Sequence, residues 1–538
     1  MTAETQQPPA NPIAQAMRTG TLNSMWAQLQ PDTVAVLSPH GDRTYAELNA
    51  HANQVVRTLR AAGVKAGDSI ALLCSNRPEF VEVLQAASRS GLRLTPINWH
   101  VTADEAAYVV ADCGAKALFA DARFAAVAAA AVAGGSTEVR LAIGGAIEGF
   151  DDYDTAIAQH SGDNLPDPSP GTTMLYTSGT TGRPKGVHRT PASNPSATAQ
   201  SSETASPMME TMRSAASYQA GQDVTLVTGP LYHAAPLAFA LSIPLVYGTT
   251  VSLMDGWDPE ETLRLIDSQR VTHTHLVPTM FHRLLSLPDD VRSKYDVSSL
   301  RLVWHGAAPC PVPVKKAMLD WLGPVIYEYY GATEGLTTVV TPQEWLARPG
   351  TVGRPRDEQI MVYDDNDQPC PPGVPGTIYI QAPAEGRFAY YGDQDKTSNA
   401  YRGDYYTLGD VGYLDDEGWL FLTDRSTNLI ISGGVNIYPA EVEAVLITHP
   451  AVGDVAVIGV PNEEWGEEVK AVVELQPGVV ESAALGEDII ACARNALAGY
   501  KVPRSVDFVA RLPREDNGKL YKRQLRDQYR ARGAATPS

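Results

Sequence analysis

The chain has 538 residues, of which 44% are hydrophobic and 19% are charged, a balance typical of a globular protein with several domains. It carries 42 Lys and Arg against 62 Asp and Glu, so its net charge of −20 argues against a nucleic-acid partner or a strongly anionic lipid surface. Any polyanionic ligand must therefore be held by a local group of donors.

The cysteines and the apolar segments indicate a reducing compartment. No stretch reaches the roughly 20 apolar residues of a membrane span, and the first thirty residues lack the apolar core of a signal peptide. The most apolar run, residues 124–134, is short and predicts a packed helix. The sequence thus predicts a cytoplasmic protein with no integral membrane segment. The five cysteines are far apart without CxxC or Cys/His clustering, which disfavours disulfides and a zinc site: Cys74, Cys113, Cys310, Cys370 and Cys492.

Helical and strand-like segments alternate from residue 44 to about residue 167. Residues 45–62 and 77–90 have helical spacing, whereas 69–74 and 92–96 are short apolar runs. The same alternation continues further along the chain. Helices are predicted at 259–269 and 279–287, and buried strands at 226–228, 250–254, 275–277, 301–303 and 325–327. This order predicts an α/β fold in which helices cover the sheets.

The pattern changes from about residue 351. Gly, Pro and Asp become frequent and the predicted strands shorten, at 360–363, 376–381 and 419–423. We interpret residues 351–425 as a β-rich subdomain of a large N-terminal domain, residues 1–425. Residues 426–538 then form a small α+β domain. Its predicted elements lie at 439–447, 452–460, 469–475, 487–497 and 505–508.

A loop at residues 176–186, YTSGTTGRPKG, has the composition of a phosphate cradle. Glycines let backbone N–H groups close around an anion, hydroxyls donate to phosphoryl oxygens, and a lysine adds positive charge. Pro184 stands where a Walker A loop requires glycine before its lysine, so this is a different cradle. The predicted binding residues are Thr177, Ser178, Gly179, Thr180, Thr181, Gly182 and Lys185.

Further motifs follow this loop in a fixed order. They are PLYH at 230–233, HGAAP at 305–309, YYGATE at 329–334, LGD at 408–410, DR at 424–425, GGVNIYP at 433–439 and NGK at 517–519. Together they resemble the adenylate-forming superfamily, which includes acyl-CoA synthetases, luciferases and peptide-synthetase adenylation domains. The resemblance runs across almost the full chain and implies that the C-terminal domain is mobile.

The resemblance implies an ATP site with bound Mg²⁺. Tyr330 stacks on adenine, Thr333 touches the α-phosphate, and Glu334 holds Mg²⁺ together with Thr177. Asp410 and Arg425 bind the ribose. Two alternatives stay open from the residues themselves: the aromatic pair could be core packing, and Asp410 could lie in a solvent-exposed turn. The remaining implied nucleotide-binding residues are Gly306, Ala307, Ala308, Pro309, Tyr329, Gly331, Gly433 and Gly434.

The acid site is predicted from small and apolar residues. The resemblance implies that His233 borders the acyl carboxylate and the thiol entrance, whereas a lone buried His is usually a satisfied core residue. The nominated wall residues carry no charge that would select an amino group, which favours a hydrophobic carboxylic acid, fatty, aryl or polycyclic. Those residues are Val277, Met280, Trp304, Gly306 and Gly331. Cys310 lies beside them without a base-rich environment and is interpreted as structural.

Lys519 is the predicted catalytic lysine, together with His233, Thr333 and Glu334. A lysine delivered by a separate domain can bind the carboxylate and α-phosphate oxygens together. The alternative is a surface lysine, since Lys522, Arg523 and Arg526 lie nearby in the sequence.

The sequence therefore predicts an AMP-forming acid–thiol ligase that uses ATP, Mg²⁺ and coenzyme A. Residues 460–473 resemble acyl-CoA synthetases, which favours a free thiol acceptor. A carrier protein or partner enzyme as the acyl acceptor, a non-catalytic nucleotide binder and a homodimer are left open. One departure stands out: after Asp424 and Arg425 the family usually places a charged hinge residue, whereas this chain has Ser426, Thr427 and Asn428.

Overall fold

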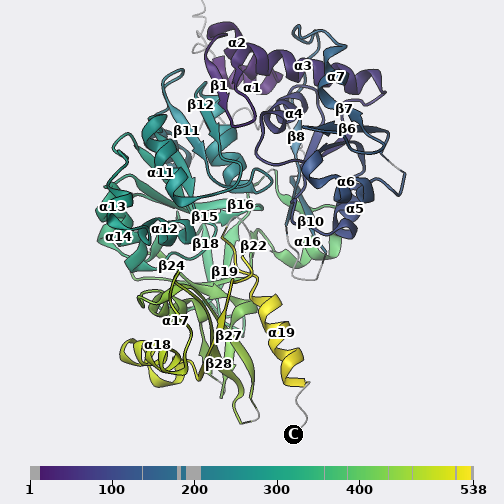
Figure 1. Ribbon diagram of the computed structural model, residues 1–538. Helices are drawn as coiled ribbons and strands as arrows, with labels where there is room; N and C mark the ends of the chain where they lie inside the picture. Colours follow the sequence, from purple (N-terminus) through teal and green to yellow (C-terminus); the bar gives the residue numbers. More distant parts are fainter. Residues whose placement is uncertain are drawn as a thin grey trace, which may run out of the picture.

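The computed structural model describes residues 12–135, 137–177, 183–189, 207–356, 358–384, 386–433, 435–462, 464–514 and 518–534. Figure 1 shows an N-terminal body of sheets and helices above a smaller C-terminal domain. No helix of these ranges is long and apolar enough to cross a membrane.

The first sheet is parallel throughout and has the strand order β7-β6-β5-β3-β4-β8. Its strands are β3 (Ser69–Leu73), β4 (Arg93–Pro96), β5 (Ala115–Asp121), β6 (Val139–Ile143), β7 (Asp151–Asp152) and β8 (Thr172–Thr173). The helices of this region are α3 (Tyr45–Ala61), α4 (Pro78–Ser88), α5 (Ala103–Asp112), α6 (Ala125–Ala131) and α7 (Tyr153–Ala158). Capping boxes at Thr44 and Thr102 fix where α3 and α5 begin.

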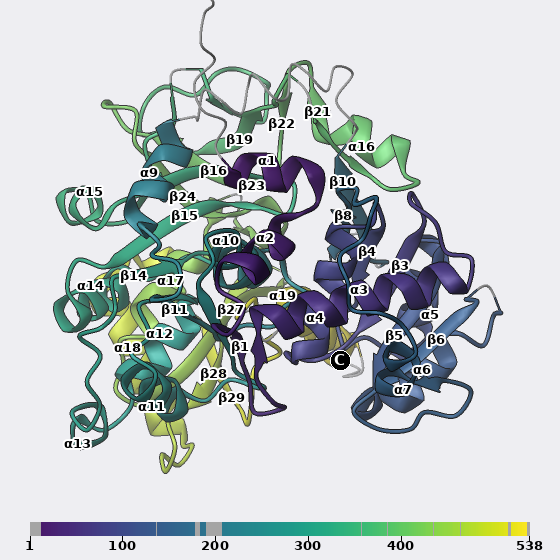
Figure 2. The ribbon, with the colours of Figure 1, turned by 90° about the horizontal axis from the view of Figure 1, so that it is seen from above.

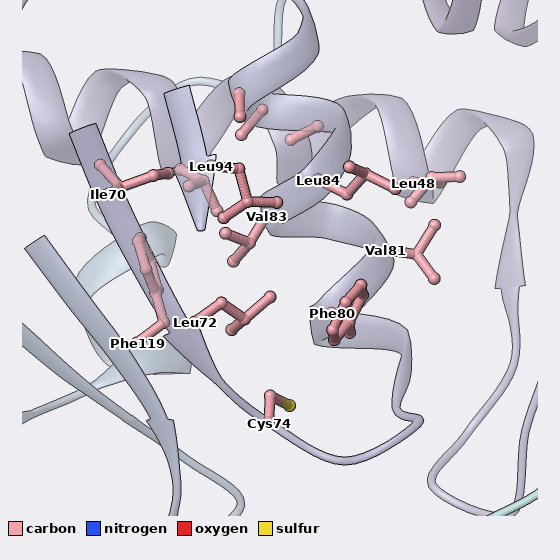
Figure 3. Packing of buried hydrophobic residues seen from close by; sticks show 14 of the residues in the cluster. Leu48, Ile70, Leu72, Cys74, Phe80, Val81, Val83, Leu84, Leu94 and Phe119 are labelled. Atoms are coloured by element: carbon pink, nitrogen blue, oxygen red, sulfur yellow. The ribbon is translucent and has the colours of Figure 1, made fainter. Parts of the chain in front are cut away.

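Alternating side chains of this sheet build the core on one of its faces. Figure 3 shows Leu72 of β3 and Phe119 of β5 on the side of α4, whose Phe80 lies opposite them. These side chains are fully buried. Burial of such large apolar groups supplies the main favourable free energy of folding here.

The second sheet has eight strands in the order β16-β15-β14-β13-β11-β12-β1-β2. Its central pairs are parallel, and the β15–β16 edge is an antiparallel hairpin. The strands are β1 (Val34–Leu37), β2 (Arg43–Thr44), β11 (Val224–Val227), β12 (Thr250–Leu253), β13 (His273–Leu276), β14 (Leu302–His305), β15 (Ile326–Ala332) and β16 (Gly335–Val340). The carboxyl ends of its parallel strands lead into the motifs nominated above.

Helices cover both sheets. In Figure 2, seen from above, α2 and α3 lie over the junction between the two sheets. The helices of the second sheet and the N-terminus are α1 (Pro12–Thr19), α2 (Leu22–Leu29), α9 (Pro207–Ala216), a π-helical segment (Pro236–Ser242), α10 (Ile243–Val246), α11 (Pro259–Ser268), α12 (Pro278–Leu285), α13 (Asp289–Arg292), α14 (Val312–Leu322) and α15 (Pro342–Ala347).

The β-rich region forms a mostly antiparallel sheet, β17-β24-β23-β19-β22-β21, with β18 beside β19. Its strands are β17 (Thr351–Gly353), β18 (Ile360–Tyr363), β19 (Gly376–Gln381), β21 (Tyr401–Arg402), β22 (Tyr405–Tyr406), β23 (Asp410–Leu414) and β24 (Leu420–Arg425). A separate three-stranded sheet pairs β10 (Lys185–Arg189) with β9 (Leu175–Thr177) and with β20 (Phe388–Tyr390), which precedes α16 (Gln394–Ala400). This pairing brings the glycine-rich loop next to the β-rich region.

The C-terminal domain has its own core and a five-stranded sheet, with the order β26-β25-β28-β27 and β29 beside β28. Its elements are β25 (Ile430–Ser432), β26 (Val435–Ile437), α17 (Pro439–Leu446), β27 (Val452–Asn462), β28 (Gly466–Leu475), α18 (Ala483–Ala496), β29 (Ser505–Val509) and α19 (Lys522–Ala534). The predicted fold class, an α/β body of helix-covered sheets with a β-rich part and a small α+β domain, is confirmed.

Several predicted boundaries differ from the structure by a few residues, and two of them show why. The helix predicted at 487–497 begins at Ala483, because the Ser482 side chain accepts a hydrogen bond from Leu485 N and caps the helix earlier. The strand predicted at 226–228 is β11, Val224–Val227, because parallel pairing with β12 extends it toward its N-terminal end.

The two domains meet at α12 and at the segment after β24. A side chain at Gly518 would lie only 2.5 Å from Oγ1 of Thr279 in α12, and the φ of Gly518 is +79°, so glycine fits this contact on both counts. The Asp424 carboxylate of β24 accepts hydrogen bonds from the backbone N–H of Ala440 (2.9 Å) and from Nδ2 of Asn428 (3.0 Å), and Nζ of Lys522 lies 3.9 Å away. Asp424 therefore ties the β-rich sheet to the start of α17.

Candidate active site

A buried carboxylate joins the second sheet to the β-rich sheet. The Tyr330 hydroxyl on β15 donates to Oδ2 of Asp410 at 2.9 Å, and Nε of Arg425 lies 3.2 Å from Oδ1. Asp410 is 8% exposed, so it does not lie in a solvent-exposed turn. Burial raises the pKa of the Asp410 carboxyl, and the Arg425 charge and the Tyr330 hydrogen bond oppose that rise. The Asp410 carboxylate is therefore held in a fixed position, where it can accept hydrogen bonds from hydroxyl groups.

Replacing Asp410 by alanine is expected to raise the KM for ATP by about tenfold to a hundredfold, the range for losing a hydrogen bond to a charged acceptor. The order in which different acids are preferred should stay the same, because the predicted partner of Asp410 is the ribose and not the acid. Steady-state kinetics with two acids of different size measure both quantities. Asp416→Ala, which removes an exposed carboxylate from the next turn, is the matched control. A changed acid preference would contradict the placement of Asp410.

Glu334 occupies the turn between β15 and β16 and is 7% exposed. Its Oε1 accepts a hydrogen bond from the Tyr390 hydroxyl at 2.9 Å, and its backbone oxygen accepts one from Arg189 at 3.2 Å. Nζ of Lys396 lies 4.2 Å from the centre of the Tyr390 ring. Thr333 precedes Glu334 in the same turn, half-buried. Two cationic side chains, Arg189 of β10 and Lys396 of α16, thus lie near this fixed carboxylate.

The ends of the glycine-rich loop face each other across a strand pair. Thr177 of β9 and Lys185 of β10 are antiparallel register partners. Nζ of Lys185 forms an ion pair with Asp393 at 2.9 Å, and the Asp393 hydrogen bond raises the pKa of this lysine. Five predicted phosphate-binding residues lie outside the described residues: Ser178, Gly179, Thr180, Thr181 and Gly182. Gly434 does as well.

The two adjacent tyrosines of β15 have different environments. Consecutive strand residues face opposite sides of a sheet. Tyr329 points into the core, where its hydroxyl lies 2.9 Å from Nε2 of His275, whereas Tyr330 contacts Asp410. A Cβ at Gly306 would lie 2.6 Å from Cζ of Tyr329, so only glycine permits this approach. The predicted core-packing alternative therefore describes Tyr329, and Tyr330 is the member beside the polar site.

The turn after β14 has an unusual backbone. Ala307 has a φ of +68°, a left-handed conformation that a non-glycine residue adopts at a cost of about 1–3 kcal/mol. Ala307 and Pro309 are exposed, with Ala308 half-buried between them. Gly331 lies on the neighbouring strand, where a Cβ would meet the Gly335 carbonyl oxygen at 2.6 Å. The absence of a side chain at Gly331 therefore lets β15 approach β16 closely beside this turn.

A buried ion pair between α14 and β15 lies next to this turn. Nζ of Lys315 on α14 lies 2.5 Å from Oε2 of Glu328 on β15, and His305 at the end of β14 lies 3.4 Å from the same oxygen. All three side chains are almost completely buried. Burial raises the pKa of Glu328, but Lys315 and His305 outweigh it and hold that pKa well below its usual range. This ion pair fixes the ends of two neighbouring strands relative to α14.

The predicted acid-pocket residues fall into two groups. Trp304 packs in an aromatic cluster with Phe239 and Tyr327, with ring centroids 5.4 Å and 5.6 Å away. Val277 and Met280 belong instead to the core beneath α12. Met280 also lines a cavity of about 140 Å³ between the domains, together with Thr279 and Gly518. The structure therefore does not bring Val277 and Met280 together with Trp304.

His233 and Lys519 lie in different domains, and both are half-buried. His233 follows Tyr232, whose ring centroid is 4.4 Å from its own, and it is half-buried. Lys519 is half-buried and directly follows Gly518, which packs against α12. The lysine segment of the C-terminal domain is therefore docked on the N-terminal body.

Burial raises the pKa of the Cys310 thiol, which leaves it unreactive.

Several site residues were missed by sequence reasoning. They lie in or beside β10, β13, β20 and α16: Arg189, His275, Tyr390, Asp393 and Lys396. Asp393 is the N-cap of α16 and could have been noticed as a capping residue. No pattern linked Tyr390 to Glu334, because they meet only through the pairing of β10 with β20.

Comparison with known proteins gives consistent matches over the whole chain. Residues 24–388 match the family described as AMP-binding enzyme, and residues 441–519 match its C-terminal domain. Feruloyl-CoA synthase of Amycolatopsis sp is 34% identical over 94% of this chain and 97% of its own. The 2-succinylbenzoate–CoA ligase of Geobacillus kaustophilus is 33% identical over 93% and 96%. The crystal structure of the anthranilate CoA ligase AuaEII with anthranoyl-AMP superposes with a TM-score of 0.82 at 25% identity, covering 96% of this chain and 98% of that one.

Proposed function

Because the chain belongs to the family of AMP-binding enzymes, we propose that it joins an aromatic carboxylic acid to coenzyme A with ATP as the energy source. It is an AMP-forming acid–thiol ligase that acts in two steps. The observation that supports the placement of the nucleotide best is the buried Tyr330–Asp410 pair of β15 and β23, with the exposed Arg425 at the end of β24 beside it.

In the first step an oxygen of the substrate carboxylate attacks the α-phosphorus of ATP, and the bond to pyrophosphate breaks on the opposite side. The product is an acyl-adenylate. Asp410 accepts hydrogen bonds from the ribose, and Arg425 keeps that carboxylate in place. Lys185 lies at the edge of the loop that contacts the phosphates, and Lys519 reaches the reacting oxygens. The enzyme contributes position and electrostatic stabilisation of the charge that develops on those oxygens.

Mg²⁺ fits the donors of this site. It prefers hard oxygen ligands and commonly binds through one or two carboxylates plus substrate phosphates. Glu334 is a buried carboxylate held by Tyr390, and Thr177 offers a hydroxyl at the start of the loop. No group of three or more acidic, His or Cys side chains able to hold a metal occurs within the described ranges. When bound, Mg²⁺ would neutralise phosphate charge.

In the second step the thiolate of coenzyme A attacks the acyl carbonyl carbon and AMP leaves with the bonding pair. His233 borders the reacting carbonyl. The loop at Gly433 must reach the thiol path, and the ring of Trp465 covers it: a Cβ at Gly433 would lie 2.6 Å from that ring. The docked position of Gly518 on α12 corresponds to the adenylating arrangement, so a rotation of the C-terminal domain separates the two steps.

An aryl acid is the substrate class that the surroundings favour. Trp304, Phe239 and Tyr329 form a close-packed aromatic cluster behind the small residues Gly306 and Gly331. A flat ring can stack on such a cluster, whereas a long alkyl chain would have to displace it. The relatives named above act on ferulate and 2-succinylbenzoate, and the solved structure holds anthranoyl-AMP.

The function is tested by supplying benzoate, anthranilate, ferulate and palmitate, each with ATP, Mg²⁺ and coenzyme A. Formation of AMP and of the matching thioester, followed by mass spectrometry, is expected for an aryl acid and not for palmitate. Acid-dependent exchange of labelled pyrophosphate into ATP without thioester would instead indicate a carrier-protein or partner-enzyme acceptor. Absence of exchange with every acid of a wider panel would indicate a non-catalytic binder.

The hinge sequence yields a further prediction. Ser426–Asn428 form a short 3₁₀ turn, and Arg526 of α19 donates to the backbone oxygen of Thr427. Thr427→Pro, which fixes φ, is expected to slow thioester formation at least tenfold while leaving pyrophosphate exchange nearly unchanged. Thr427→Lys should also leave exchange unchanged and should alter the second step. Single-turnover assays of each step measure this, and an unaffected second step in the proline variant would place the hinge elsewhere.

A further inference from the structure

A cavity of about 250 Å³ lies at the N-terminal end of the body, outside the site described above. It is bordered by the start of α2, by α3 and by the segment at residues 164–168. Figure 1 shows α2 and α3 at the end of the molecule opposite the C-terminal domain. None of the residues that line it belongs to the adenylation motifs.

Arg89 is the one charged residue in the lining, and it is 4% exposed. Its guanidinium donates to Oδ1 of Asn49 at 2.7 Å, to Oδ1 of Asn53 at 2.8 Å and to the backbone oxygen of Gln85 at 3.1 Å. All of these acceptors are neutral amide oxygens. Within the described part of the chain no carboxylate pairs with Arg89, and burial alone lowers its pKa to about 10. A buried cation without a counter-ion is costly, so this position favours a bound anion.

The polar groups around Arg89 are oriented as donors. Nδ2 of Asn49 donates to Oδ1 of Asn164 at 2.9 Å, which uses the oxygen of that side chain and leaves its amino group to donate. Nη2 of Arg89 donates to no residue in the described ranges and is not sealed from the cavity. The Thr21 side chain does not cap α2, so the first-turn amides of α2 at the cavity wall lack a side-chain acceptor.

We propose that this cavity binds a small oxyanion, a carboxylate or a phosphate, between the guanidinium of Arg89, the amide of Asn164 and the start of α2. Met25, Leu165 and Pro168 supply apolar walls, so a carboxylate with a short hydrocarbon chain fits as well as free phosphate. The acidic neighbour Asp167 is paired with Arg60 at 2.8 Å and does not compensate Arg89. This site is separate from the nucleotide and acid sites.

Isothermal titration calorimetry of the full chain with sodium phosphate, and separately with sodium butyrate, at constant ionic strength tests the proposal. Asn164→Asp keeps the oxygen that accepts from Asn49 but replaces the donor with a negative charge. Ser24→Met fills the cavity from its rim without touching the Arg89 network. Both variants are expected to weaken binding of the effective anion at least tenfold. The anion that binds identifies whether phosphate or carboxylate is the source.

Asn366→Asp makes the same charge change in an exposed turn of the β-rich region and should bind like the unmodified protein. Anions also enter the adenylation site, and any binding that persists in both cavity variants belongs there. If neither anion binds in the millimolar range, or if binding is unchanged in both cavity variants, the proposal is wrong.

Discussion

Lys519→Ala is expected to lower the rate of acid-dependent pyrophosphate exchange by about 10²–10³-fold, the range for removing one group that stabilises developing charge in a transition state. The reason is the position of Lys519 relative to the N-terminal body. Gly518 is docked against Thr279 of α12, and in the proposed mechanism this position of the C-terminal domain brings the neighbouring lysine to the atoms that form the acyl-adenylate. After rotation of the C-terminal domain the lysine no longer faces the reacting atoms, and thioester formation from supplied acyl-adenylate should change little.

The matched control for this variant is Arg494→Ala, which removes an exposed cation from α18 of the same domain. It should leave both steps unchanged. Exchange assays follow the first step, and rapid mixing of synthetic acyl-adenylate with coenzyme A follows the second. An equal loss in both steps for Lys519→Ala would mean that the lysine acts throughout the cycle, or that the domain has lost its fold, which circular dichroism distinguishes.

Glu334→Gln is expected to lower kcat/KM for ATP by about 10²-fold or more and to raise the Mg²⁺ concentration needed for half-maximal exchange. The substitution keeps the size and the oxygen that accepts from the Tyr390 hydroxyl, so the turn should stay folded. What is lost is the negative charge near Lys396 and Arg189, and with it a hard ligand for the ion.

Titration of exchange activity with Mg²⁺ is the measurement for Glu334→Gln. Glu138→Gln is the control, because Glu138 is an exposed carboxylate paired only with Lys116 on the surface of the first sheet. An unchanged Mg²⁺ dependence in the Glu334 variant, at a reduced maximal rate, would assign Glu334 to positioning of the turn rather than to the metal.

The sequence predicted the fold well where local periodicity decides the structure. The strand at residues 360–363 and the helix at 439–447 agree with β18 and α17 to within one residue, because their apolar patterns match the face that each buries. For the adjacent tyrosines, the local sequence pattern could not show which one faces the core. The pleat of the strand places Tyr329 in the core and Tyr330 at the polar site.

Other parts of the site depend on contacts between distant segments. Asp410 lies in a turn-rich stretch whose composition suggests exposure to solvent. It is instead buried and accepts a hydrogen bond from the hydroxyl of Tyr330, eighty positions away along the chain. Val277 and Met280 are as apolar as Trp304, and composition could not show that they pack in a different core. Tyr390 meets Glu334 only because β20 pairs with β10. Such contacts follow from the tertiary arrangement of the sheets.

The bonds of Asp424 have a consequence for the timing of catalysis. Its carboxylate belongs to β24, yet Ala440 and Asn428, which donate to it, lie beyond that strand, as does the nearby ammonium of Lys522. A rotation about Ser426–Asn428 that moves α17 and α19 must break the hydrogen bond from Ala440 and separate Lys522 from Asp424. In the proposed two-step cycle, the rate of this rotation should therefore depend on how strongly Asp424 holds these two groups.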